Sequence, residues 1–106
     1  MVRSGRKAVS SAGTRVSLLD PSVDHKVRMA GWVTVCADKN NGGIVYVGDA
    51  TTQNASGSGG YIGIPLTAGE FVNIREMGGP SYLDLALIYI DADTSTDAVT
   101  FNYGQR

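Results

Sequence analysis

Residues 41–49, Asn-Gly-Gly-Ile-Val-Tyr-Val-Gly-Asp, place a turn sequence directly before an alternating run of β-branched and aromatic residues. Asn-Gly tolerates the positive φ angles of a tight turn, whereas Val, Ile and Tyr are typical of strands. Residues 63–70, 87–93 and 99–103 repeat this combination of strand and turn. The four stretches predict a small antiparallel β protein whose turns are made by Gly, Pro, Asn and Asp.

Extending this pattern along the chain predicts about seven strands with turns at sandwich spacing and no convincing helix. The expected strands are an edge-like strand at 16–19, alternating strands at 26–38 and 44–47, a strand at 61–64, a strand at 71–75, a central strand at 83–92 and a closing strand at 98–103. Pro65 cannot donate to a sheet ladder, so we expect it at an edge or at a strand end. We therefore expect an all-β fold, a single antiparallel β-sandwich of jelly-roll or immunoglobulin-like type.

Two connections have distinctive compositions. Residues 38–43 contain the Asn-Gly pair and are expected to join the strand at 26–38 to the strand at 44–47 as a hairpin. Residues 50–60 have almost no apolar side chain and are rich in Gly and Ser, which predicts an exposed, mobile loop that is a candidate contact surface.

The 106 residues are enough for one domain, and the net charge of −1 conceals an uneven distribution. Residues 1–28 carry six basic and two acidic side chains, whereas residues 29–106 carry three basic and eight acidic ones. Residues 1–15 are small, polar and basic, so we expect a flexible N-terminal arm there and the β-sandwich domain at residues 16–106.

The arm supplies four of the six candidate interaction residues, namely Arg3, Arg6, Lys7 and Arg15. We expect it to become ordered on an acidic partner surface, and its deletion to leave the domain folded. No aromatic residue lies among these basic residues for base stacking, so we expect no specific nucleic-acid partner.

The other two candidate interaction residues are Trp32, which lies on a strand with apolar residues on both faces, and Tyr61. Apolar residues on both faces of this strand leave more apolar surface than one small sandwich can bury, which predicts a homo-oligomer, with a trimer as the first choice.

Catalytic, redox and membrane functions find little support in the sequence. The only histidine, His25, stands at a predicted strand end, and no Gly-x-Ser-x-Gly motif accompanies it. The single Cys36 is expected to be a buried, inert thiol. No apolar segment approaches the length of a membrane span. We expect neither an enzyme nor a cofactor.

The acidic segment, residues 91–97, spaces three aspartates as the first half of a calcium loop does. Thr96 replaces the glycine that such a loop needs, and Asn102 replaces its bidentate glutamate. We expect turn-forming, solvated aspartates and no metal site, with a weak calcium site as the alternative.

The order of motifs over residues 26–103 resembles small β-sandwich proteins of tailed bacteriophages. The recurring positions are Val45, Tyr46, Val47, Gly48, Asp49, Pro65, Leu66, Gly69, Glu70, Ile88, Tyr89 and Asp91. The loop at 50–60 and the Gly78-Gly79-Pro80 break depart from the compact pattern. The resemblance implies a virion structural protein, made in the cytoplasm of the bacterial host and located on the capsid surface.

Within that class, we expect a capsid cement or decoration protein that bridges major capsid protein subunits and is anchored by the arm. A tail, neck or head-fibre component is the structural alternative. A carbohydrate-binding β-sandwich module is the alternative from another class, in which exposed Trp32, Tyr61 or Tyr82 would stack on sugar rings.

Overall fold

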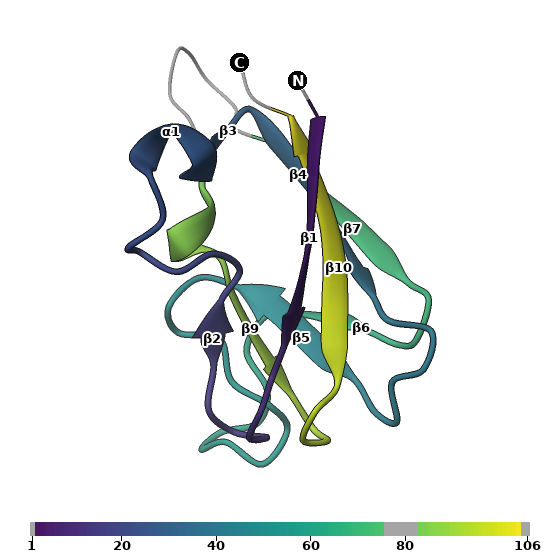
Figure 1. Cartoon of the computed structure of the whole chain (residues 1–106). Helices are drawn as coiled ribbons and strands as arrows, with labels where there is room; N and C mark the ends of the chain where they lie inside the picture. The colour runs from purple at the N-terminus through teal and green to yellow at the C-terminus, as the bar shows by residue number, and fades with distance from the viewer. Residues whose placement is uncertain (1, 76–82, 105–106) are drawn as a thin grey trace.

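The computed structural model describes residues 2–75 and 83–104, and it has the expected all-β fold built from antiparallel sheets (Figure 1). Sheet A has the order β1-β10-β4-β7, with β1 Val2–Ala8, β10 Ala98–Gly104, β4 Trp32–Ala37 and β7 Phe71–Arg75. Sheet B has the order β2-β9-β5-β6, with β2 Val16–Ser17, β9 Tyr89–Ala92, β5 Val45–Gly48 and β6 Ile64–Leu66. A small third sheet pairs β3 Met29–Ala30 with β8 Leu83–Asp84.

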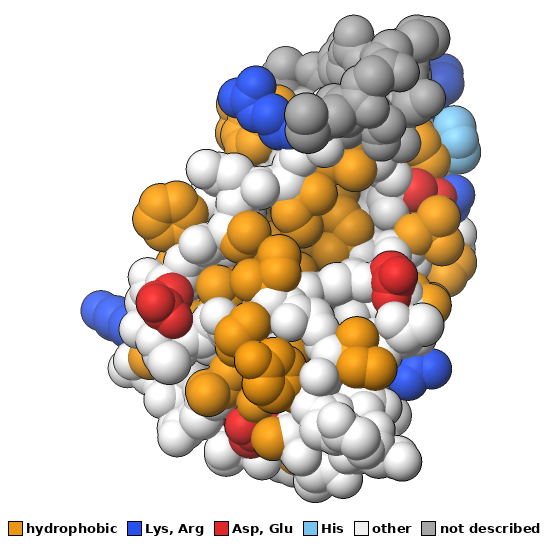
Figure 2. All heavy atoms as spheres, turned by 180° about the vertical axis from the view of Figure 1, so that it is seen from behind, with side chains coloured by type: hydrophobic (Ala, Val, Ile, Leu, Met, Phe, Trp, Pro, Cys, Tyr) orange, Lys and Arg blue, Asp and Glu red, His pale blue; other side chains and the backbone are white. Residues whose placement is uncertain are grey.

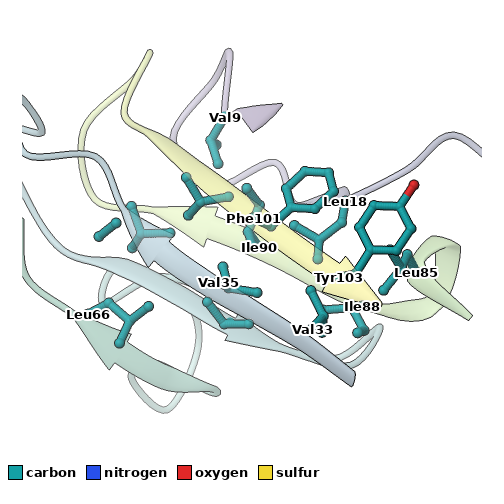
Figure 3. Packing of buried hydrophobic residues seen from close by; sticks show 14 of the residues in the cluster. Val9, Leu18, Val33, Val35, Leu66, Leu85, Ile88, Ile90, Phe101 and Tyr103 are labelled. Carbon is teal, nitrogen blue, oxygen red and sulfur yellow. The ribbon is translucent and has the colours of Figure 1, made fainter. Parts of the chain in front are cut away.

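The core draws on both four-stranded sheets. In β4, Val33 and Val35 are fully buried, whereas their neighbours Trp32 and Thr34 are only half-buried, as the two-residue period of a strand requires. The same alternation turns one face of β10, β5 and β9 inward. These side chains, with Val9, Leu18, Leu66 and Leu85, belong to one hydrophobic cluster (Figure 3).

The expected flexible arm is wrong for most of its length. Residues 2–8 form β1, which pairs with β10 from Val2 opposite Gly104 to Ala8 opposite Ala98. Val9 then enters the core with no exposed surface. A strand of polar residues is stable here because the neighbouring strand supplies a complete backbone ladder, a contribution that side-chain composition does not reveal. The domain therefore begins at β1, not at residue 16.

The expected hairpin at residues 38–43 is also wrong. β4 pairs with β10 and β7 in sheet A, whereas β5 pairs with β6 and β9 in sheet B, so the connection passes between sheets. Neither Asn41 nor Gly42 has the positive φ of a type I′ turn. Instead Asn41 Nδ2 donates to Ala98 O and Asn41 Oδ1 accepts from Ala98 N, at 2.8 and 2.9 Å.

Two predicted strands are interrupted by short helices. The region of the strand expected at 26–38 begins with one helical turn, α1 His25–Arg28, because the Asp24 carboxylate accepts a hydrogen bond from Lys26 N and caps it. The strand expected at 83–92 contains a 3₁₀ turn, η1 Leu85–Leu87, capped in the same way by Asp84.

The predicted edge positions are confirmed, since β2 and the Pro65-containing β6 are the outer strands of sheet B.

Candidate interaction surfaces

Asp91 connects three parts of the chain through its buried carboxylate. It lies on β9 with only 1% of its surface exposed. Its Oδ1 accepts hydrogen bonds from Gly13 N at 3.0 Å and from Ala92 N at 2.8 Å, and its Oδ2 accepts one from Asn54 N at 3.0 Å. Backbone N–H groups therefore compensate the burial of this charge, and they do so from segments far apart in the sequence.

Asp93 and Asp97 hold other loops in the same way. Asp93 accepts from Ala55 N at 3.0 Å and from the Tyr46 hydroxyl at 2.8 Å. Asp97, also buried, accepts from Gly42 N and Gly43 N at 2.9 and 2.8 Å. The acidic segment is thus an organising centre for loops, which corrects the expectation that its aspartates are all solvated.

The loop at residues 50–60 is consequently anchored to sheet B. Thr52 and Asn54 are buried, and Asn54 Nδ2 donates to Ala92 O at 2.8 Å in addition to the bond from its backbone to Asp91. The expectation of an exposed, mobile loop is wrong for this half of it. Its Gly-rich half remains at the surface, where Ser58 and Gly59 are exposed. Individual polar side chains hold this half of the loop in place, and the overall composition of the loop does not reveal them.

Tyr46 and Tyr61 form a stacked aromatic pair on the outer side of sheet B. Their ring centroids are 5.0 Å apart, and Tyr46 is buried while 53% of Tyr61 is exposed. Burial and, next, the hydrogen bond to the Asp93 carboxylate raise the pKa of Tyr46 to about 12. Tyr61 therefore covers Tyr46 and still exposes part of its own side chain to solvent.

The outer face of sheet A is mainly polar. Strand register places Ser4, Asn102, Thr34 and Asn73 in one row across the four strands. Ser4 donates to Asn102 and Thr34 donates to Asn73, both at 2.5 Å. These bonds link neighbouring strands along the row.

Trp32 lies at one end of this outer face and is half-buried. Its indole ring lies on Gly104, where an added Cβ would overlap the ring nitrogen, so this packing requires a glycine. Beside it, a pocket of about 250 Å³ is lined by Trp32, Val33, Thr34, Asn73 and Arg75. The structure thus places Trp32 on an open sheet face and not in the core.

The four basic candidates lie on or near the strands β1 and β2 at one edge of the two sheets (Figure 1). Arg3, Arg6 and Lys7 are in β1, and the exposed Arg15 immediately precedes β2. Arg6 Nη2 forms an ion pair with Asp38 at 3.1 Å, and the Asn40 backbone N–H together with Arg6 lowers the pKa of Asp38. We call these four residues the basic side. Trp32 and Tyr61 are not part of it, since they belong to sheet A and sheet B respectively.

The opposite edge, carrying β6 and β7, exposes apolar side chains (Figures 1 and 2). Ile62, Ile64 and Phe71 are 46%, 45% and 62% exposed, and Tyr61 adjoins them in the chain. We call these four residues the apolar side. Sequence reasoning identified only Tyr61, because it assigned the other three to predicted strands without predicting which side chains would be exposed. Ile64 is exposed on the edge strand β6, whereas Phe71 is exposed because its register with Cys36 places it on the outer face of sheet A. The residue pattern did not specify that β7 is an edge strand.

The residues considered for catalysis, redox chemistry and metal binding lie apart from one another in the structure. His25 is exposed at the start of α1, and Cys36 is half-buried on the outer face of sheet A, not buried as expected. No group of three His, Cys, Asp or Glu side chains among residues 2–75 and 83–104 is arranged to hold a metal ion. Gly78, Gly79, Pro80 and Tyr82 lie outside the described residues.

Comparisons with protein-family models, curated proteins and solved structures found no match. In the described part of the chain, no helix has the length and apolarity needed to cross a membrane.

Proposed function

We propose that this chain is a bacteriophage virion structural protein, a capsid cement or decoration protein that stabilises the head by bridging major capsid protein subunits. Its two four-stranded sheets would form the β-sandwich of such proteins. The positions that carry the resemblance fall mainly on β5, β6 and β9 of sheet B and on the turn before β7. They include Asp91, which holds the loop at 50–60 on that sheet.

The observation that carries the proposal is the division of the surface into a basic side at β1 and β2 and an apolar side at β6 and β7. A protein whose function is to bind other proteins needs binding surfaces that keep a defined position on its fold. The hydrogen bonds of Asp91, Asp93 and Asp97 hold the loops in defined positions. Two different surfaces on opposite edges allow one chain to meet two partners at once.

The basic side is the proposed capsid contact, which revises the role of the arm. Arg3, Arg6, Lys7 and Arg15 would face acidic groups of the major capsid protein, but from an ordered strand and its following loop. Each contact is weak, and salt screens it. Repetition over the symmetric shell multiplies the contacts, so that many weak ones resist the outward pressure of packaged DNA.

The carbohydrate-binding alternative requires an aromatic row across one sheet face. Among the described aromatic residues, Trp32 lies on sheet A, whereas Tyr61 stacks on Tyr46 of sheet B. This arrangement does not favour the alternative over the virion role.

The test of the capsid contact is a binding assay on capsids that lack the protein. Arg15→Glu reverses a charge on the basic side, and Lys39→Glu makes the same charge change at an exposed residue of the connection at 38–43. We expect weaker capsid binding for Arg15→Glu than for Lys39→Glu, with a difference that shrinks at high salt. Equal binding of the two variants, or no binding by the unaltered chain, would overturn the proposed contact.

A further inference from the structure

The two large sheets have four outer strands, and three of them carry features that discourage pairing with another chain. β2 has only two residues, and β6 contains Pro65. In β1, register places Arg3 opposite Tyr103 and Lys7 opposite Val99, in the rows that face the core, and charges in such positions oppose edge-to-edge association. β7 is different: its five residues, Phe-Val-Asn-Ile-Arg, contain no Pro, Gly or Lys.

The backbone groups at the outer edge of β7 can be assigned from one hydrogen bond. Ala37 N donates to Glu70 O at 2.8 Å, so the carbonyl group of Glu70 faces β4. In an antiparallel strand successive residues direct these groups to opposite sides. The N–H and C=O groups of Phe71, Asn73 and Arg75 therefore point away from β4. Among the described residues, no strand pairs with them there.

These three residues are complementary to themselves about a two-fold axis. If Asn73 of one copy lies opposite Asn73 of another, Phe71 lies opposite Arg75, and every outward N–H meets an outward C=O. On the outer face the Arg75 guanidinium would lie over the Phe71 ring of the other copy, which is a favourable cation–π arrangement. On the inner face Val72 would lie opposite Ile74, and both are half-buried in the single chain.

We propose that β7 is a self-association strand, at which a second copy of this chain pairs antiparallel with the register Asn73 to Asn73. The two copies of sheet A then form one continuous eight-stranded sheet. This pairing covers the exposed Phe71 ring, and it predicts a two-fold contact in place of the trimer expected from the sequence.

One consequence rests on the proposed function. Because β1 and β7 are the opposite edges of sheet A, the pair carries its two basic sides at its two far ends. A pair could then reach two capsid subunits, which is what bridging requires. The association itself does not depend on a capsid and is tested without one.

The first experiment measures the mass of the purified full chain by sedimentation velocity over a range of concentrations. We expect a monomer–dimer equilibrium. Phe71→Lys places a cation opposite Arg75 of the other copy at two symmetric points and should give monomer, whereas Phe71→Glu, which removes the same ring, should retain the dimer. The double variant Phe71→Lys/Arg75→Glu should restore it. Phe71 is 62% exposed, so circular dichroism should show each variant folded.

The second experiment traps the register. Paired residues in such a ladder have Cα atoms about 5.5 Å apart, within the range of about 4.4–6.8 Å that a disulfide spans. In a Cys36→Ser background, Asn73→Cys should therefore form a covalent dimer on mild oxidation, and Ser4→Cys, on the same sheet face at β1, should not. A strictly monomeric chain, a trimer, a dimer equally affected by Phe71→Lys and Phe71→Glu, or equal crosslinking at positions 4 and 73 would overturn the proposal.

Discussion

The carboxylate of Asp91 on β9 accepts a hydrogen bond from the backbone N–H of Asn54 at 3.0 Å, and both residues are buried. The Asn54 side chain returns a bond to Ala92 O at 2.8 Å. This reciprocal pair explains how a loop of Gly, Ser, Thr and Ala can have a defined position. Apolar burial contributes little within the loop, so polar contacts to the sheet determine its course.

Asp91→Asn should destabilise the fold, because the amide keeps the shape of the side chain but loses the charge and half of the acceptor capacity. One of its three N–H donors would remain buried without a partner, at a cost of about 1–3 kcal/mol. Urea unfolding monitored by circular dichroism measures the effect. Asp49→Asn, in an exposed turn, is the matched control and should change the free energy of unfolding far less. Equal effects would contradict the role of Asp91.

Deletion of residues 2–8 should abolish or severely weaken folding, contrary to what an arm would show. The deletion removes all seven residue pairs between β1 and β10 and exposes one face of the core near Phe101. The signal to measure is the cooperative thermal transition in circular dichroism. Replacement of Ser10 and Ser11 by Gly, in the exposed segment after Val9, is the control and should leave that transition in place. An unchanged melting temperature after the deletion would show that β1 is dispensable.

Tyr46 should make the fold sensitive to alkaline pH. Its pKa is raised from 10.0 to about 12 in the folded chain by burial and then by Asp93. The protonated phenol is thus favoured by folding, so its contribution is complete below pH 10 and is lost as pH rises through about 12. Tyr46→Phe should lower stability at pH 7 by about 1 kcal/mol and flatten the decline of stability above pH 10. An identical pH profile for both proteins would refute this assignment.

Gly104→Ala should disturb the packing of Trp32, because the added methyl group would occupy the position of the indole nitrogen. The ring must move outward, and overpacking of this kind costs about 1–3 kcal/mol. Tryptophan fluorescence should shift to longer wavelength as the ring becomes more hydrated. Gly42→Ala is the control, since its added Cβ would meet Thr94 at an ordinary 3.6 Å. Unchanged fluorescence in Gly104→Ala would contradict the described position of Trp32.

The sequence predicted the class of fold and several strands because those features depend on local pattern. Alternation identified β4, β7 and β10, and the missing N–H of Pro65 placed β6 at an edge. Pairing between distant strands left no such local signal. Asn41-Gly42 has the composition of a hairpin turn, but its neighbours pair in different sheets, and the carboxylate of Asp97 takes the Gly42 amide.

The candidate surfaces were predicted less completely. The basic residues were found from charge alone, but the placement of Arg3, Arg6 and Lys7 on an ordered strand depends on β10, which lies at the other end of the chain. Phe71 and Ile64 were assigned to strands with no prediction of their exposure, which depends on strand order and register. Asp91 and Asp97 looked like solvated turn residues, because the loops that cover them come from residues 13, 42, 43 and 54.

A cryo-electron microscopy map of the intact particle would test directly whether this chain bridges subunits of a phage head. We expect β-rich density matching residues 2–75 and 83–104 on the outside of the capsid, across joints between major capsid protein subunits. The basic side should face the shell. Density for this chain only in the tail or neck, or its absence from purified particles, would contradict the claim.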